Sequence, residues 1–141
     1  MEESVARFLV EIPHPAAFII DCLWNMQAPN VTQNAVPLVK FLRANGLANT
    51  PIVLAEGSPA GQAWAAPPTA LYQSSVNAAL AAAFAELVAG GDKNLYYVKT
   101  ADLFSPSTTL EGSGTAEGCH VVDSGNHDMA ARWTTVLSGI L

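Results

Sequence analysis

A histidine and an acidic residue lie close together near the end of the chain, in the segment Thr115-Ala116-Glu117-Gly118-Cys119-His120. The surrounding glycines and serines predict a loop here rather than a helix. A carboxylate that orients an imidazole is one half of a hydrolytic triad, in which the histidine takes the proton of a nucleophile. We therefore interpret His120 as a candidate general base and Glu117 as its orienting acid. The alternative is a surface glutamate and a histidine that caps the following helix.

Asn25 is a second candidate, because it ends a nearly continuous apolar run at residues 17–24. A side-chain amide is a neutral donor that can hydrogen-bond to a developing oxyanion. The alternative is an asparagine that merely turns the chain after a strand, which is the more common use of this residue.

No residue is a convincing nucleophile for His120. Ser58 follows a predicted strand, but Gly57-Ser58-Pro59 lacks the G-x-S-x-G pattern of a nucleophile elbow. Cys119 adjoins His120, yet neighbours in a loop rarely point together, and a reactive thiolate needs a positively charged setting. Ser113 lies in a glycine-rich loop and has no supporting context.

Metal and cofactor chemistry are not expected. Glu117, His120 and His127 are too few and too weakly patterned to predict a metal site. His127 and Asp128 belong to the first turn of a predicted helix, where such residues commonly serve the helix end. We therefore predict no metal and no cofactor.

The hydrophobic pattern predicts alternating strands and helices. Helices are expected at residues 2–12, 33–44, 70–89 and 128–141, and strands at 17–24, 51–56 and 94–98. This alternation predicts one α/β domain over residues 1–141, with a parallel sheet and helices on both faces. In such sheets sites form at the carboxyl ends of the strands, which here are Trp24-Asn25, Glu56-Gly57-Ser58 and the 99–120 segment.

The composition limits the classes of molecule that the chain is expected to bind. Six Lys and Arg residues face 12 Asp and Glu residues, giving a net charge of −6, and no basic run predicts nucleic-acid binding. No apolar stretch reaches the ~18 residues of a membrane span, so no membrane association is expected. The acidic N-terminus does not resemble a signal peptide, and Cys22 and Cys119 do not form a disulfide framework, so we expect a cytoplasmic location.

Three blocks together carry a family resemblance. The segment Phe18-Ile19-Ile20-Asp21-Cys22-Leu23-Trp24-Asn25-Met26 resembles the third block of the SGNH (GDSL-like) hydrolases. The segments Thr50-Pro51-Ile52-Val53-Leu54-Ala55-Glu56 and Glu117-Gly118-Cys119-His120, the latter followed by Asp123-Ser124-Gly125, resemble the next strand and the final catalytic block. The likeness covers essentially all 141 residues in the right order.

The resemblance implies a three-layer α/β/α, flavodoxin-like SGNH fold and a serine esterase or acylhydrolase that acts on small-molecule carboxylic esters. It assigns Asn25 to the oxyanion hole and His120 to the general base, while Glu117 stands where the family has aspartate.

The family's nucleophilic serine precedes the first block matched here. We therefore expect an N-terminally truncated domain, its C-terminal two-thirds, in which the nucleophile is missing. An exposed sheet edge would then favour self-association. The alternative is a non-catalytic remnant or interaction module.

Overall fold

Three short parallel strands form the sheet at the centre of the structure. The structure is a computed structural model that describes residues 1–58, 65–99, 114–116 and 119–141. The elements in chain order are α1 (Glu3–Leu9), β1 (Phe18–Ile20), the 3₁₀ turn η1 (Leu23–Asn25), α2 (Ala28–Ala44), β2 (Ile52–Ala55), α3 (Pro67–Ala89), β3 (Leu95–Val98) and α5 (Asp123–Ser138). The strands lie in the order β1-β2-β3, with β2 in the centre.

The central strand β2 is buried on both faces. Ile52 pairs with Phe18 on one side and with Leu95 on the other, and all four residues of β2 are fully buried. Ile52 and Leu54 belong to one hydrophobic cluster, whereas Val53 and Ala55 belong to a second. This alternation follows from the period of two in a strand, which sends successive side chains to opposite faces.

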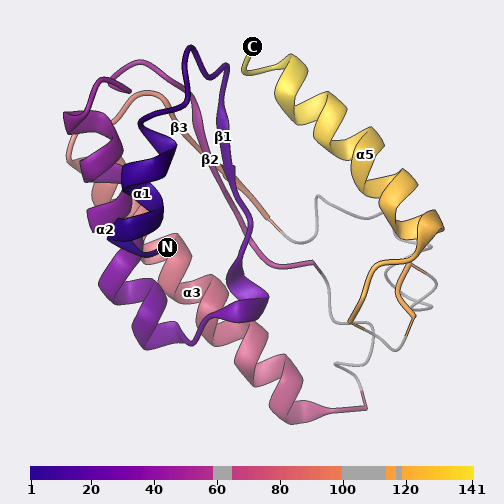
Figure 1. Cartoon of the computed structure of the whole chain (residues 1–141). Coiled ribbons are helices and arrows are strands. Elements are labelled where there is room, and N and C mark those ends of the chain that lie inside the picture. Colours follow the sequence, from indigo (N-terminus) through magenta and orange to yellow (C-terminus); the bar gives the residue numbers. More distant parts are fainter. Residues whose placement is uncertain (59–64, 100–113, 117–118) are drawn as a thin grey trace.

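The two clusters are covered by different helices. Side chains of α1, α2 and α3 pack with Ile52 and Leu54, whereas Met129 and Trp133 of α5 pack with the opposite cluster. Figure 1 shows α1, α2 and α3 on one side of the sheet and α5 on the other. The predicted α/β architecture, a parallel sheet between two helical layers, is confirmed.

Three helices begin earlier than the hydrophobic pattern predicts, whereas α1 is shorter than the helix predicted at residues 2–12. α2 begins at Ala28 rather than residue 33, and α3 at Pro67 rather than residue 70. Both carry proline in the first turn, where its missing N–H would have no helical partner and its fixed φ suits the helix. α5 begins at Asp123 rather than residue 128, and an acidic residue in the first turn interacts favourably with the helix dipole.

The first strand is shorter and less buried than predicted. Only Phe18–Ile20 of the apolar run at 17–24 is strand, and Leu23–Asn25 forms a 3₁₀ turn. A nearly continuous apolar run such as 17–24 predicts a strand buried on both faces, but Ile19 in the middle of β1 is 43% exposed, so that prediction is wrong here. The reason is position, because β1 lies at an edge of the sheet.

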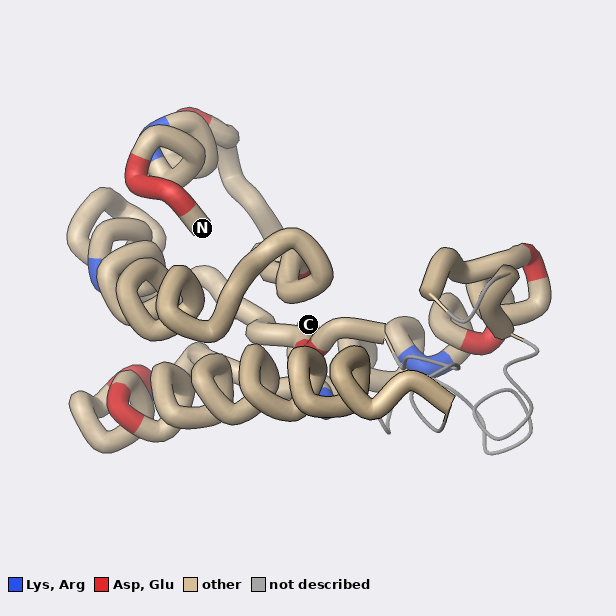
Figure 2. The backbone as a smooth tube through the Cα atoms, turned by 90° about the horizontal axis from the view of Figure 1, so that it is seen from below, with Lys and Arg blue, Asp and Glu red and all other residues tan. Residues whose placement is uncertain are grey.

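Charged side chains are sparse along the backbone. Figure 2 shows long uncharged stretches, and α3 contains Glu86 as its single charged residue. None of the helices in the described ranges combines the length and the hydropathy that a membrane-spanning helix needs.

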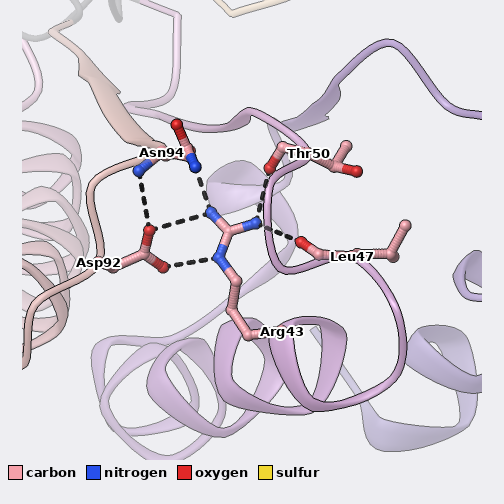
Figure 3. A network of polar contacts seen from close by, with 5 residues as sticks. All are labelled: Arg43, Leu47, Thr50, Asp92 and Asn94. Carbon is pink, nitrogen blue, oxygen red and sulfur yellow. Dashed lines mark hydrogen bonds and ion pairs between the residues drawn. The ribbon is translucent and has the colours of Figure 1, made fainter.

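One guanidinium joins three segments at the amino-terminal end of the strands (Figure 3). Arg43, near the end of α2, makes a two-pronged ion pair with Asp92, with Nε–Oδ2 at 2.8 Å and Nη2–Oδ1 at 3.1 Å. Its Nη1 donates to the carbonyl oxygens of Leu47 and Thr50, and its Nη2 donates to that of Asn94. Arg43 therefore fixes the loops that lead into β2 and β3.

Candidate functional site

Asn25 lies in the turn that follows the carboxyl end of β1. The backbone N–H of Asn25 donates to the carbonyl oxygen of Cys22 at 3.1 Å, and that of Met26 donates to Leu23 at 3.0 Å. The Asn25 side chain is exposed, whereas Leu23 and Met26 are buried on either side of it. The turn is therefore anchored in the core while its amide side chain remains accessible.

A tyrosine of α3 holds both ends of this turn. The Tyr72 hydroxyl lies 2.8 Å from the carbonyl oxygen of Leu23 and 2.7 Å from that of Met26, so it can donate to either. The Tyr72 ring also packs against Trp24, with the ring centroids 5.8 Å apart. These contacts restrict the backbone on both sides of Asn25.

A second set of contacts ties the same turn to the end of β2. The Trp24 indole N–H lies 3.0 Å from Ser58 Oγ and 3.1 Å from the Ser58 carbonyl oxygen, which also accepts from Gln73 Nε2 at 2.8 Å. Gly57 leaves room for the indole, since a Cβ there would lie 3.1 Å from Trp24 Nε1. Ser58 is buried, and its contacts give it a structural role rather than that of a nucleophile.

His120 lies in a short antiparallel pairing just before α5. Ala116 N–H donates to the His120 carbonyl oxygen at 2.8 Å, and residues 115 and 121 form an isolated bridge. The buried Gly125 packs directly against this pairing, since a Cβ on it would overlap the Gly114 carbonyl oxygen. The His120 side chain is exposed. Glu117, its predicted partner, and Ser113 lie outside the described residues.

Two observations indicate that the turn of Asn25 and the segment of His120 lie in the same region of the molecule. Burial is the main cause that raises the pKa of Tyr72, the hydrogen bond to Met26 partly opposes it, and an electrostatic interaction with Cys119 adds to the increase, so Cys119 lies within electrostatic range of Tyr72. Tyr72 itself contacts the turn that carries Asn25. Figure 1 shows this turn and the segment that leads into α5 toward the end of the sheet where the strands finish.

A half-buried tyrosine–glutamate pair lies at the carboxyl end of β2. The Tyr97 hydroxyl donates to Glu56 Oε1 at 2.8 Å. Burial is the largest cause that raises the pKa of Tyr97 well above its ordinary value, and the hydrogen bond to Glu56 and the carboxylate charge act in the same direction. The pair therefore favours the protonated phenol at the rim of the sheet.

This pair predicts a loss of stability in alkali. Because the folded chain keeps the Tyr97 proton to higher pH than the unfolded chain, the free energy of unfolding should fall as the pH rises above about 10. Tyr97→Phe should make that fall shallower, since the variant has no proton to retain. Urea unfolding of both proteins at about pH 8 and about pH 11 measures the difference. Equal falls in the two proteins would contradict the prediction.

The contacts around Tyr72, Gln73 and Ser58 had no counterpart in the sequence prediction. Tyr72 and Gln73 stand in an alanine-rich helix, and no motif marks them. Within the described residues, no group of three His, Cys, Asp or Glu side chains is placed to hold a metal ion.

Comparisons with known proteins agree with the fold. A Bacteroides ovatus protein described as a GDSL-like lipase is 27% identical, with a TM-score of 0.89 over 99% of this chain and 40% of that chain. The salicylyl-acyltransferase SsfX3 from a tetracycline biosynthetic pathway is 17% identical, with a TM-score of 0.78 over 99% of this chain and 42% of that chain, and this likeness shows a shared fold. The chain thus spans about two-fifths of each of these proteins.

A comparison with curated protein sequences found no match. The sequence profile of the GDSL-like lipase/acylhydrolase family matches residues 1–138. The chain therefore belongs to the GDSL-like lipase/acylhydrolase family.

Proposed function

We propose that this chain supplies the general base and one oxyanion donor of an SGNH-type serine esterase or acylhydrolase that acts on small-molecule carboxylic esters. His120 accepts the proton of the serine hydroxyl as the oxygen attacks the ester carbonyl carbon. The imidazolium then returns this proton to the departing alcohol, and water releases the acyl group by the same route. Glu117 orients the imidazole, and the serine comes from polypeptide outside these 141 residues.

The observation that carries the proposal is the restraint of the Asn25 turn. An oxyanion donor is effective when it is held in place before the reaction, so that no reorganisation is needed as charge develops. Tyr72 and Trp24 restrain the backbone around Asn25, while its own side chain stays exposed. The electrostatic effect of Cys119 on Tyr72 supports the proximity of the His120 segment.

The chain by itself is expected to show no histidine-dependent esterase activity. Without an activated nucleophile, it should hydrolyse p-nitrophenyl acetate at the same rate as its His120→Ala variant, within about twofold. Initial rates at several enzyme concentrations measure this. A clear His120-dependent rate would contradict the proposal that the nucleophile lies elsewhere. Cys119→Ser and Ser58→Ala would then identify the nucleophile.

A non-catalytic interaction module is the competing interpretation. It keeps the α/β scaffold and gives His120 and Asn25 no chemical role. The two interpretations differ once a serine is supplied, because only the esterase then acquires a rate that depends on both residues.

A further inference from the structure

Ser58 follows β2 at the rim of the sheet, and the proposed chemistry gives its hydroxyl no role. The residue is largely buried, with an exposed fraction of 9%. A serine hydroxyl can donate one hydrogen bond and accept two, and burying it without partners costs free energy. The contacts that Ser58 makes therefore indicate what it does for the site.

Both oxygens of Ser58 face the indole of Trp24. Trp24 Nε1 lies 3.0 Å from Ser58 Oγ and 3.1 Å from the Ser58 carbonyl oxygen, so two acceptors share the single indole N–H. The indole also lies against the backbone of Gly57. A Cβ on Gly57 would lie 3.1 Å from Trp24 Nε1 and 3.2 Å from Trp24 Cδ1, so the ring cannot move toward this residue.

The carbonyl oxygen of Ser58 also connects this contact to α3. It accepts a hydrogen bond from Gln73 Nε2 at 2.8 Å. The preceding residue of the helix, Tyr72, contacts the carbonyl oxygens at both ends of the turn η1. The turn is thus joined to the end of β2 through Trp24 and to α3 through Tyr72, and Gln73 joins these two anchors to each other. Three segments far apart in the sequence therefore form one closed network.

We propose that Ser58 is a positioning residue of the reaction, which holds Asn25 as an oxyanion donor through the indole of Trp24. The inference rests on the proposed function, which makes Asn25 that donor. Trp24 directly precedes Asn25, so a fixed indole fixes the backbone that leads into Asn25. Tyr72 restrains the turn relative to α3, and Ser58 adds a restraint relative to the sheet.

The size of the effect follows from the geometry that an oxyanion hole requires. Its donors stabilise the developing charge only when they are held in place before the reaction. A misplacement of about 1 Å can lower a rate by about 10²-fold. Loss of one of two anchors should displace the donor by less than this, so we expect a loss of about tenfold.

NMR of the chain itself tests whether Ser58 holds the turn. Trp24→Phe identifies the Trp24 indole signal among those of the three tryptophans. Ser58→Ala should speed hydrogen exchange of this indole N–H by about fivefold or more, because one of its acceptors is lost. In Trp24→Phe, which keeps an aromatic ring beside Tyr72, the order parameter of the Asn25 backbone N–H should fall from roughly 0.85 toward about 0.6.

Kinetics test whether the restraint acts through Asn25. When a serine-bearing strand is joined to the chain, Trp24→Phe should lower kcat for p-nitrophenyl acetate about tenfold. KM should stay within about twofold, since the donor acts on the transition state rather than on the bound ester. In an Asn25→Ala background the same substitution should change kcat by less than about twofold, because the group that it positions is already absent.

Two further variants make the comparison specific. Gly57→Ala removes no hydrogen-bonding group, but its Cβ requires the indole to move by a few tenths of an ångström, so it should lower kcat in the same direction as Trp24→Phe. Trp133→Phe is the matched control, since Trp133 lies in α5 and packs with the opposite hydrophobic cluster. It should leave the Asn25 order parameter unchanged and kcat within about twofold.

Two results would overturn the inference. One is an Asn25 order parameter that stays the same in both Trp24→Phe and Gly57→Ala. The other is a loss of kcat in Trp24→Phe that persists in full in the Asn25→Ala background, since the contact would then stabilise the fold without acting through Asn25. If Asn25→Ala itself leaves kcat unchanged, the proposed role of Asn25 fails, whereas the NMR results still decide whether Ser58 holds the turn.

Discussion

Replacing Arg43 with alanine should lower the free energy of unfolding by about 3–5 kcal/mol. The side chains of Arg43 and Asp92 are 16% and 11% exposed, so removal of the guanidinium leaves a largely buried carboxylate without its ion-pair partner. The carbonyl oxygens of Leu47, Thr50 and Asn94 lose a donor in the same change. Such a loss is a large share of the roughly 5–15 kcal/mol that typically stabilises a domain.

The measurement is equilibrium unfolding in urea, with Arg7→Ala as the matched control. Arg7 also pairs with a carboxylate, that of Glu3, but both side chains are 66% exposed. That variant should lose less than about 1 kcal/mol, since exposed ion pairs contribute little. Arg43→Lys should fall in between, because an ammonium cannot reproduce the two-pronged contact with Asp92. Similar losses in Arg43→Ala and Arg7→Ala would show that the buried network contributes little.

The order and type of the elements could be predicted from the sequence, since they depend on local patterns. The continuous apolar run before Glu56 is typical of a buried strand, and the apolar residues of α3 recur with the spacing of a helix. The alternation of strands and helices along the chain predicts a parallel sheet covered by layers of helices. Helix starts were predicted less well because Pro29 and Pro67 favour the first turn of a helix as well as loops.

Contacts between distant residues could not be predicted in this way. The Arg43–Asp92 pair joins residues 49 positions apart, and the Trp24–Ser58 contact joins residues 34 apart. Neither contact is marked by a motif in the local sequence. Each forms only when the parallel strands bring together loops that are far apart in the chain. The exposure of Ile19 has the same origin, because an apolar run does not reveal whether its strand is central or at an edge.

Positions of the candidate site residues were predicted with uneven success. The sequence placed Asn25 after a strand and His120 before the last helix, as the structure has them. It gave no indication that Tyr72 would restrain the turn of Asn25. The pairing of Glu117 with His120 remains a prediction, since Glu117 lies outside the described residues.

The largest expected effect on activity concerns a form of the chain that contains a serine-bearing strand. Met1 lines the same pocket as Ile19 and Ile20 of β1, so a strand joined to Met1 through a flexible linker can reach the outer edge of β1. In this fusion His120→Ala should lower kcat for p-nitrophenyl acetate by about 10³- to 10⁴-fold, the contribution of a well-placed general base. Asn25→Ala should lower it by about 10²- to 10³-fold through loss of an oxyanion donor.

Two neighbouring residues of the same types provide controls. His127 is exposed in α5, and Asn30 is exposed in α2. Neither has a role in the proposed chemistry, so His127→Ala and Asn30→Ala should change kcat by less than about twofold. Losses in these variants equal to those in His120→Ala and Asn25→Ala would indicate general damage to the fold.

The most direct test is the kcat of the fusion compared with that of its His120→Ala variant. We predict that removal of the imidazole abolishes nearly all hydrolysis that depends on the added serine. The opposite result, a serine-dependent enzyme that keeps its rate without His120, would show that the base lies elsewhere.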